Sequence, residues 1–116
     1  MQVSVDGFLG GRLRLEQPKI GYRAGIDPVL LAAACPAQRG QEVLELGCGV
    51  GVASLCLGRR VPGLALHGVE ILNDYAQIAR ENAARNNLEF DVRQGDVSVL
   101  PTPFYYRKFP HVIMNV

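Results

Sequence analysis

A cluster of three glycines, at positions 47, 49 and 51, constrains the fold of this chain more than any other feature. It joins the apolar stretch 42–46 to residues 52–60, where apolar side chains recur at helical spacing. Glycine adopts backbone conformations that other residues avoid and carries no Cβ atom, so the cluster predicts a tight turn with space beside it. A turn from strand to helix lies at the carboxyl end of a strand, where open α/β sheets bind ligands.

The remaining sequence alternates between strand and helix patterns. Such alternation is typical of a parallel sheet with right-handed helical crossovers, so we predict a Rossmann-like, doubly wound, mainly parallel α/β sheet. Two alternating runs around Gly10 and Gly11 predict a short N-terminal hairpin. The expected strands are 42–46, 64–71, 90–94 and 111–115, and the expected helices are 27–35, 52–60 and 73 or 74 to 86.

Capping residues and prolines predict where some of these elements begin. Asp27 is expected to cap the first helix, with Pro28 in its first turn. Asn73 or Asp74 is expected to cap a later helix. Two prolines in residues 101–106 predict a loop that carries three aromatic side chains.

Length, composition and charge set broad limits on function. The 116 residues suffice for one domain, and 48% hydrophobic residues suffice for a core. A net charge of +1 neither indicates nor excludes a nucleic-acid binder. We interpret the basic residues within 12–23 and at 107–108 as solvated surface, with RNA phosphate as the alternative partner of Lys19 and Arg23.

The cysteines and the longest apolar run bear on compartment, metal and membrane. Three cysteines without a secretory signal favour reduced thiols and a cytoplasmic location. No CxxC pair is present, so we expect no metal site. The apolar run 26–37 contains Asp27 and two prolines and is too short for a bilayer, so we expect no membrane role.

The spacing of the glycines distinguishes two cofactor classes. A dinucleotide-binding turn, G-x-G-x-x-G, would need a glycine where this chain has Val52. The pattern from Glu45 onward is instead acidic-x-G-x-G-x-G, and it resembles the first motif of class I methyltransferases, which use S-adenosylmethionine. The resemblance implies that Gly47, Gly49 and Gly51 lie against the carboxypropyl and ribose part of the cofactor and that Glu45 helps orient its amino group. A structural turn without a ligand is the alternative.

Three further residues surround the expected cofactor. Cys48, inside the turn, is interpreted as a small residue against the cofactor, and a reactive thiol is the alternative. Glu70 ends the second expected strand about twenty residues past the glycines, where a carboxylate can accept two hydrogen bonds from a ribose diol. Ile71 follows it and is assigned to the same site. An ordinary exposed glutamate is the alternative for Glu70.

Two residues after the third expected strand complete the cofactor assignment. Asp96 stands where the methyltransferase pattern places a carboxylate against the exocyclic amine of the cofactor's adenine, and Val97 follows it. The resemblance implies that both border the adenine. The alternative is a loop aspartate that caps the next turn.

The last expected strand ends in the candidate catalytic residue, Asn115. Methyltransferases that act on adenine N6 and related amines carry Asn-Pro-Pro-Phe/Tyr at this place, where the asparagine positions the amine for in-line attack. This chain departs from the pattern because Val116 stands where proline is expected. A buried strand that ends by chance in asparagine is the alternative.

The N-terminal stretch carries a more specific resemblance. Segments FLGGR, QP and GYRAGIDPVLLA resemble the beginning of bacterial tRNA-valine adenine-N6 methyltransferases, of the "methyltransferase small" group. The resemblance implies that Tyr22, Arg23 and Asp27 border the methionine end of the cofactor. We accordingly divide the chain into a hairpin and cofactor-covering segment, 1–26, and a partial S-adenosylmethionine-binding domain, 27–116.

The resemblance predicts a methyl transfer to adenine N6 in tRNA. Three alternatives remain: a cofactor-binding module without activity, a nicotinamide-dependent oxidoreductase, and a protein-glutamine methyltransferase. Class I methyltransferases usually have seven strands, and fewer are expected here. We therefore consider the fold incomplete at its C-terminus and predict an open sheet edge that promotes self-association.

Overall fold

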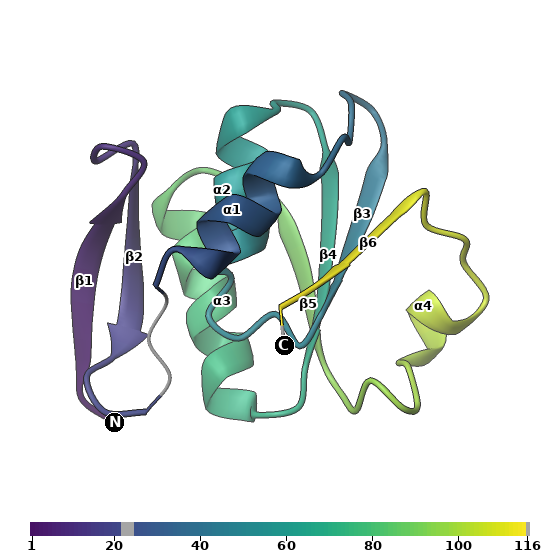
Figure 1. Ribbon diagram of the computed structural model, residues 1–116. Coiled ribbons are helices and arrows are strands. Elements are labelled where there is room, and N and C mark those ends of the chain that lie inside the picture. Colours follow the sequence, from purple (N-terminus) through teal and green to yellow (C-terminus); the bar gives the residue numbers. More distant parts are fainter. Residues whose placement is uncertain (22–24, 116) are drawn as a thin grey trace.

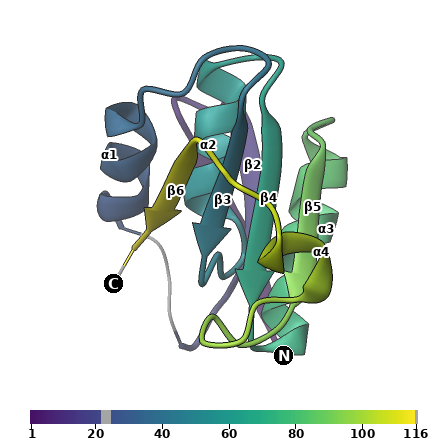
Figure 2. The ribbon, with the colours of Figure 1, turned by 90° about the vertical axis from the view of Figure 1, so that its right-hand side faces the viewer.

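The computed structural model describes residues 1–21 and 25–115 of the chain. A β-hairpin, a layer of helices and a four-stranded sheet lie side by side, and a short helix covers the far face of the sheet (Figures 1 and 2). The strands are Val3–Phe8 (β1), Leu13–Pro18 (β2), Glu42–Leu46 (β3), Ala65–Glu70 (β4), Phe90–Gln94 (β5) and His111–Met114 (β6). The helices are Asp27–Ala34 (α1), Val52–Arg60 (α2), Asn73–Arg85 (α3) and Thr102–Tyr105 (α4).

The four-stranded sheet has the order β5-β4-β3-β6 and is parallel throughout. The chain therefore moves outward from β3 to β5 and then returns to the other side of β3, as Figure 2 shows. This reversal of strand order places a topological switch point between β3 and β6, where open α/β sheets bind ligands. The predicted Rossmann-like class, the hairpin and the strand positions are confirmed, with boundaries within one residue.

Both faces of the sheet are covered by apolar packing. On one face, α1 and α2 form the main core, with Leu55, Leu57 and Val43 fully buried. On the other face, Phe104 of α4 packs between Leu44 and Val69. The prediction of a loop at 101–106 is therefore wrong in part, because residues 102–105 form a helical turn. The two prolines suggest irregular backbone, but burial of Phe104 orders this turn.

Two asparagines of α3 attach the hairpin to the domain. Asn82 exchanges hydrogen bonds with the backbone of Glu16, and Asn86 does the same with the backbone of Arg14. Asn82 also donates to the carbonyl of Val50 in the glycine turn. Both amides are buried, and they provide the backbone N–H and carbonyl groups at the edge of β2 with the hydrogen bonds that a neighbouring strand would make.

The helix caps differ from the expectation. The N-cap positions are Ile26 in α1 and Leu72 in α3, and neither helix has a side-chain cap hydrogen bond. Asp27 lies within the first turn of α1, where its charge complements the helix dipole. At α3 the N-cap is Leu72, and the carboxylate of Glu70 accepts a hydrogen bond from its N–H, so the preceding strand contacts the start of the helix.

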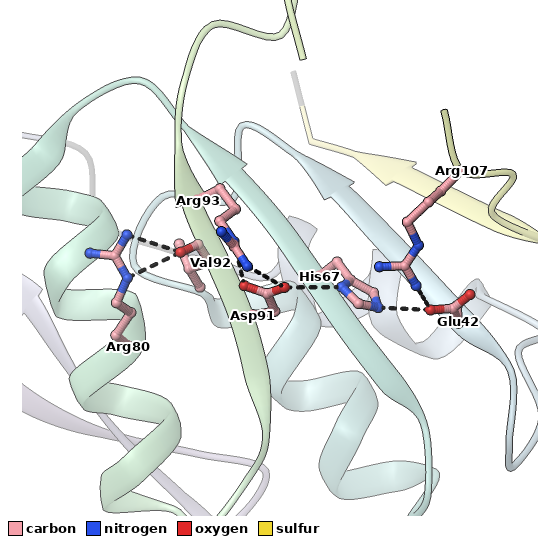
Figure 3. A network of polar contacts seen from close by, with 7 residues as sticks. All are labelled: Glu42, His67, Arg80, Asp91, Val92, Arg93 and Arg107. Atoms are coloured by element: carbon pink, nitrogen blue, oxygen red, sulfur yellow. Dashed lines mark hydrogen bonds and ion pairs between the residues drawn. The ribbon is translucent and has the colours of Figure 1, made fainter. Parts of the chain in front are cut away.

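A polar network crosses the sheet face near α4 (Figure 3). His67 Nε2 lies 3.1 Å from Glu42 Oε1, and its Nδ1 lies 3.7 Å from Asp91 Oδ2. Arg107 also pairs with Glu42. The ring of His67 packs edge-on against Phe104, and burial lowers its pKa. These contacts join three strands to the covering segment and give His67 a structural role.

Three further observations concern cysteines, metals and membranes. All three cysteines are free and buried. Among residues 1–21 and 25–115, no group of three or more histidine, cysteine or acidic side chains could hold a metal ion. Within the same residues no helix has the length and apolar character needed to cross a membrane.

The edge strand β6 is the basis of a prediction about oligomeric state. Within the described residues its strand partner is β3, and Val112 and Met114 are about half exposed. An uncharged edge with free backbone groups pairs readily with another chain, whereas a charge on the edge opposes pairing. Light scattering is expected to give a mass above that of one chain, and Val112→Lys is expected to lower it. Val99→Lys, in an exposed loop, is the control, and a monomeric wild-type chain would contradict the prediction.

Candidate functional site

A cavity of about 280 Å³ opens at the carboxyl ends of the central strands. It spans the switch point between β3 and β6 and reaches the starts of α2 and α3. Six residues predicted for the site line it: Glu45, Gly47, Cys48, Gly49, Glu70 and Asn115. These six residues lie in or directly after the strands β3, β4 and β6.

The glycine turn forms the floor of the cavity. Gly47 and Gly49 have φ angles of +67° and +57°, in the left-handed region that favours glycine. A Cβ atom built on either residue would meet nothing within 4 Å, so both leave open space next to the backbone. Gly51 differs, because its Cβ atom would lie 3.2 Å from the ring of Phe90. Gly51 therefore allows close packing at the start of α2 and does not line the cavity.

Glu70 holds the turn in place from the end of β4. Its Oε1 accepts a hydrogen bond from the N–H of Gly49 at 2.8 Å, and its Oε2 accepts one from the N–H of Leu72 at 2.9 Å. The side chain is buried, so both oxygens have fixed positions. Each carboxylate oxygen has a further lone pair, which leaves Glu70 able to accept hydrogen bonds from a ligand in the cavity.

Glu45 lies deeper, and its ionisation is unusual. It is 3% exposed, and its Oε1 accepts hydrogen bonds from the hydroxyl of Ser54 at 2.6 Å and from the N–H of the same residue. Burial raises the pKa of Glu45 to about 7, against the opposing effect of Ser54, and the charge of Glu70 raises it further. A cation bound in the cavity would stabilise the ionised form.

Cys48 is a packed thiol. It is buried, and an added Cβ atom at Gly68 would lie 2.9 Å from its sulfur. Burial and the nearby carboxylates of Glu45 and Glu70 raise the pKa of the thiol. Because the thiolate is the nucleophile, these surroundings disfavour a reactive cysteine.

Asn115 reaches the cavity because of strand register. Met114 of β6 pairs with Leu46 of β3, so the next residue of each strand, Asn115 and Gly47, leaves the sheet at the same level. Both line the cavity. The parallel pairing of β3 and β6 therefore brings the candidate catalytic amide beside the turn.

The other predicted site residues lie elsewhere. The cavity lining does not include Asp27, Ile71, Asp96 or Val97. Asp96 Oδ1 accepts hydrogen bonds from the N–H and the hydroxyl of Ser98, which is the turn-capping role given as its alternative. Their cofactor contacts stay predictions. Tyr22 and Arg23 lie outside the described residues.

Sequence reasoning missed six residues that line the cavity. They are mostly apolar and come from α1, the glycine turn and the starts of α2 and α3: Pro28, Val50, Val52, Ala53, Leu72 and Tyr75. For residues 50–53 the available signal was adjacency to the glycines. Pro28 and Tyr75 gave none, because only the packing of α1 and α3 beside the turn brings them to the cavity.

The lining fits the cofactor that the resemblance implies. Among residues 1–21 and 25–115, two carboxylates and no basic side chain line the cavity, which favours a cationic ligand and disfavours the pyrophosphate of a dinucleotide. S-adenosylmethionine carries a sulfonium and an ammonium group, and its ribose has a diol that Glu70 can bind. The open space at Gly47 and Gly49 would admit it close to the backbone.

Comparison with known proteins identifies the family of this chain. A family model described as a methyltransferase domain matches residues 43–116. A tRNA1(Val) (adenine(37)-N6)-methyltransferase of Yersinia enterocolitica is 33% identical over 69% of this chain, and the match covers 32% of that protein. A 23S rRNA (uracil(1939)-C(5))-methyltransferase of Shewanella denitrificans is 52% identical over 44% of this chain and 12% of its own length.

A solved structure shows the same fold. The tRNA (uracil-54, C5)-methyltransferase of Pyrococcus abyssi, in complex with S-adenosyl-L-homocysteine, has a TM-score of 0.71 and 16% identity. The similarity covers 97% of this chain and 27% of that one. The matched part of this chain covers about a third of the length of the tRNA1(Val) methyltransferases that it matches. The chain belongs to the methyltransferase-domain family, and its fold is that of a class I, S-adenosylmethionine-dependent methyltransferase.

Proposed function

We propose that this protein transfers a methyl group from S-adenosylmethionine to the N6 atom of an adenine in tRNA. The observation that carries the proposal is that Asn115 lines the same cavity as the glycine turn and Glu70. An amide that can bind the target amine thus lies beside residues that can hold the methyl donor.

The residues of this chain divide the work of holding the cofactor. The backbone at Gly47 and Gly49 would lie against it, Glu70 would accept the ribose hydroxyls, and Glu45 would pair with the ammonium group. We also propose that, within residues 1–26, the segment between the hairpin and α1 covers the cofactor. Gly21 supports this, because its Cβ atom would lie 3.1 Å from the hydroxyl of Tyr75, which lines the cavity.

The role of Asn115 follows from the chemistry of an exocyclic amine, whose lone pair is delocalised into the ring. The cofactor, when bound, supplies an electrophilic methyl group on a positively charged sulfur. The side-chain oxygen of Asn115 would accept an N–H of the amine and orient its lone pair toward that carbon. The N–C bond would form as the S–C bond of the cofactor breaks, with the bonding electrons left on sulfur, and the amine would lose its proton to water.

The choice of tRNA rests on the relatives. Several tRNA1(Val) (adenine(37)-N6)-methyltransferases match about two thirds of this chain or more, and the Shewanella relative acts on rRNA. RNA is the substrate class common to these names. Such an enzyme would work in the cytoplasm, which the free cysteines support.

The test combines cofactor binding with analysis of the product. Calorimetry is expected to show binding of S-adenosylhomocysteine and none of NAD. With labelled S-adenosylmethionine and a tRNA-Val anticodon stem-loop, mass spectrometry of the nucleosides is expected to find N6-methyladenine. Asn115→Ala is expected to lower the rate at least 100-fold with little change in the binding of S-adenosylhomocysteine.

Three outcomes would contradict the proposal. Binding of NAD alone would favour an oxidoreductase. Binding of S-adenosylhomocysteine without methyl transfer would leave a cofactor-binding module. A label on another nucleoside, or on glutamine of a protein, would show that Asn115 serves a different amine.

A further inference from the structure

A second groove, rich in arginine, lies at the opposite end of the helices from the cavity. Four of its seven lining residues are arginines and none is acidic. They come from the hairpin, from the last turn of α2 and from the end of α3: Arg12, Arg14, Arg59 and Arg85, with Gly11, Asn86 and Asn87. A net charge of +1 for the whole chain conceals this local concentration.

Two of the arginines are held by structural contacts. Arg59 donates to the carbonyl of Asn86 at 2.7 Å, which caps the end of α3. Arg85 pairs with Glu16 at 2.5 Å. These contacts account for part of the cluster only, since Arg59 Nε is buried and has no hydrogen-bond partner among the described residues.

The other two arginines are available to a ligand. Arg12 and Arg14 are exposed, and within residues 1–21 and 25–115 no ion pair or side-chain hydrogen bond involves either guanidinium group. Arg12 ends the hairpin turn and Arg14 is the second residue of β2, on either side of Leu13, whose side chain is fully buried. Two exposed guanidinium groups two residues apart in the hairpin can contact neighbouring phosphates of one nucleic-acid strand.

The groove is separate from the cofactor cavity but attached to it. Helices α2 and α3 begin at the cavity, with Val52 and Leu72 in its wall, and their last turns carry Arg59 and Arg85. At about 1.5 Å per residue, these helices separate the two sites by roughly 10–20 Å. A strand that reaches from one site to the other would place several nucleotides between the groove and the target base.

We propose that this groove binds the phosphodiester backbone of the RNA substrate, with Arg12 and Arg14 as the principal contacts. The choice of RNA rests on the proposed function, whereas the preference for phosphate rests on the arginines themselves. Arginine is suited to this ligand because its planar guanidinium group matches phosphate oxygens in a bidentate arrangement.

The test measures the affinity for RNA as a function of salt. The double variant Arg12→Gln, Arg14→Gln is compared with the wild type for binding of a fluorescent single-stranded RNA. Each lost phosphate contact changes the salt dependence by about 0.7, so we expect a slope smaller by about 1.4 and an affinity roughly 25-fold lower at 0.1 M salt. Arg39→Gln, Lys108→Gln removes the same charge from exposed positions elsewhere and is expected to change the affinity little.

The outcomes separate this proposal from the proposed function. The proposal that the groove binds RNA would be overturned if both double variants lowered the RNA affinity equally, or if the first did not lower it. A wild type that does not bind RNA would also overturn it. Displacement of RNA by inorganic phosphate as efficiently as by unlabelled RNA would also overturn it, because the site would then hold free anions. Calorimetry with S-adenosylhomocysteine on the same proteins tests the cofactor cavity independently, and an unchanged affinity would show that the fold is retained.

Discussion

Replacing Glu70 with glutamine is expected to lower the affinity for S-adenosylhomocysteine roughly 100-fold. The carboxylate of Glu70 accepts hydrogen bonds from Gly49 and Leu72 through different oxygens. Glutamine offers one acceptor oxygen, so in either orientation its NH2 group faces a backbone N–H. One charge-assisted bond is lost at a cost of about 1.5–3 kcal/mol, and the turn loses its fixed position. Chemical denaturation is expected to show a loss of stability of this size.

A comparison of ligands separates the structural role of Glu70 from its contact with the ribose. Removing the 2′-hydroxyl from S-adenosylhomocysteine is expected to weaken binding to the wild type about tenfold, and to weaken binding to Glu70→Gln much less. Glu89→Gln changes an exposed glutamate outside the cavity and serves as the control. If the deoxy ligand loses the same factor in both proteins, Glu70 supports the turn without binding the sugar.

The elements nearest the glycine turn were predictable because their chemistry is local. The spacing of Gly47 and Gly49 predicts left-handed turn positions, and both have positive φ angles. The positions of Glu45 and Glu70 follow from where their strands end, and both line the cavity. Asn115 was predictable only in part, since its place depends on β6 pairing with β3 and not with β5.

Features that depend on contacts between distant residues were not predictable. Asn82 and Asn86 read as polar positions in a helix, and nothing in the sequence indicates that they pair with a strand about seventy residues earlier. The arginine groove is of the same kind. Arg12 and Arg14 suggest a solvated surface until the fold brings Arg59 and Arg85 beside them.

The predicted helix caps were wrong for a related reason. Asn73 and Asp74 are good capping residues by type, yet the helix already begins at Asn73, with Leu72 as N-cap and the N–H of Leu72 bound to Glu70. Glu70 is already held by its hydrogen bond to Gly49, so it binds Leu72 without further loss of conformational freedom. The start of α3 therefore follows from a contact with the preceding strand and not from the capping preference of its own residues.

Glu45→Gln is expected to stabilise the protein above neutral pH while weakening its hold on the cofactor. The folded protein raises the pKa of Glu45 from 4.5 to about 7, so folding favours the protonated form. The carboxyl group of Glu45 does not change the free energy of unfolding below about pH 4.5. It lowers this free energy as the pH rises to about 7, and the effect then levels off. At about 1.4 kcal/mol per pKa unit, the free energy of unfolding of the variant should exceed that of the wild type by roughly 3 kcal/mol at pH 8 and should equal it at low pH, as measured by denaturation at each pH.

The affinity for S-adenosylhomocysteine is expected to rise with pH, whereas the contribution of Glu45 to stability falls. If the ionised carboxylate pairs with the ammonium group, the affinity of the wild type should rise about tenfold between pH 6 and pH 8 and level off above, with release of a proton. Glu45→Gln should bind more weakly with a flat profile. Ser54→Ala removes a hydrogen bond that lowers the pKa of Glu45, so it should move the midpoint to higher pH. A wild-type affinity that is constant over this range, or a glutamine variant less stable than the wild type at pH 8, would show that the buried carboxyl of Glu45 does not link folding to cofactor binding.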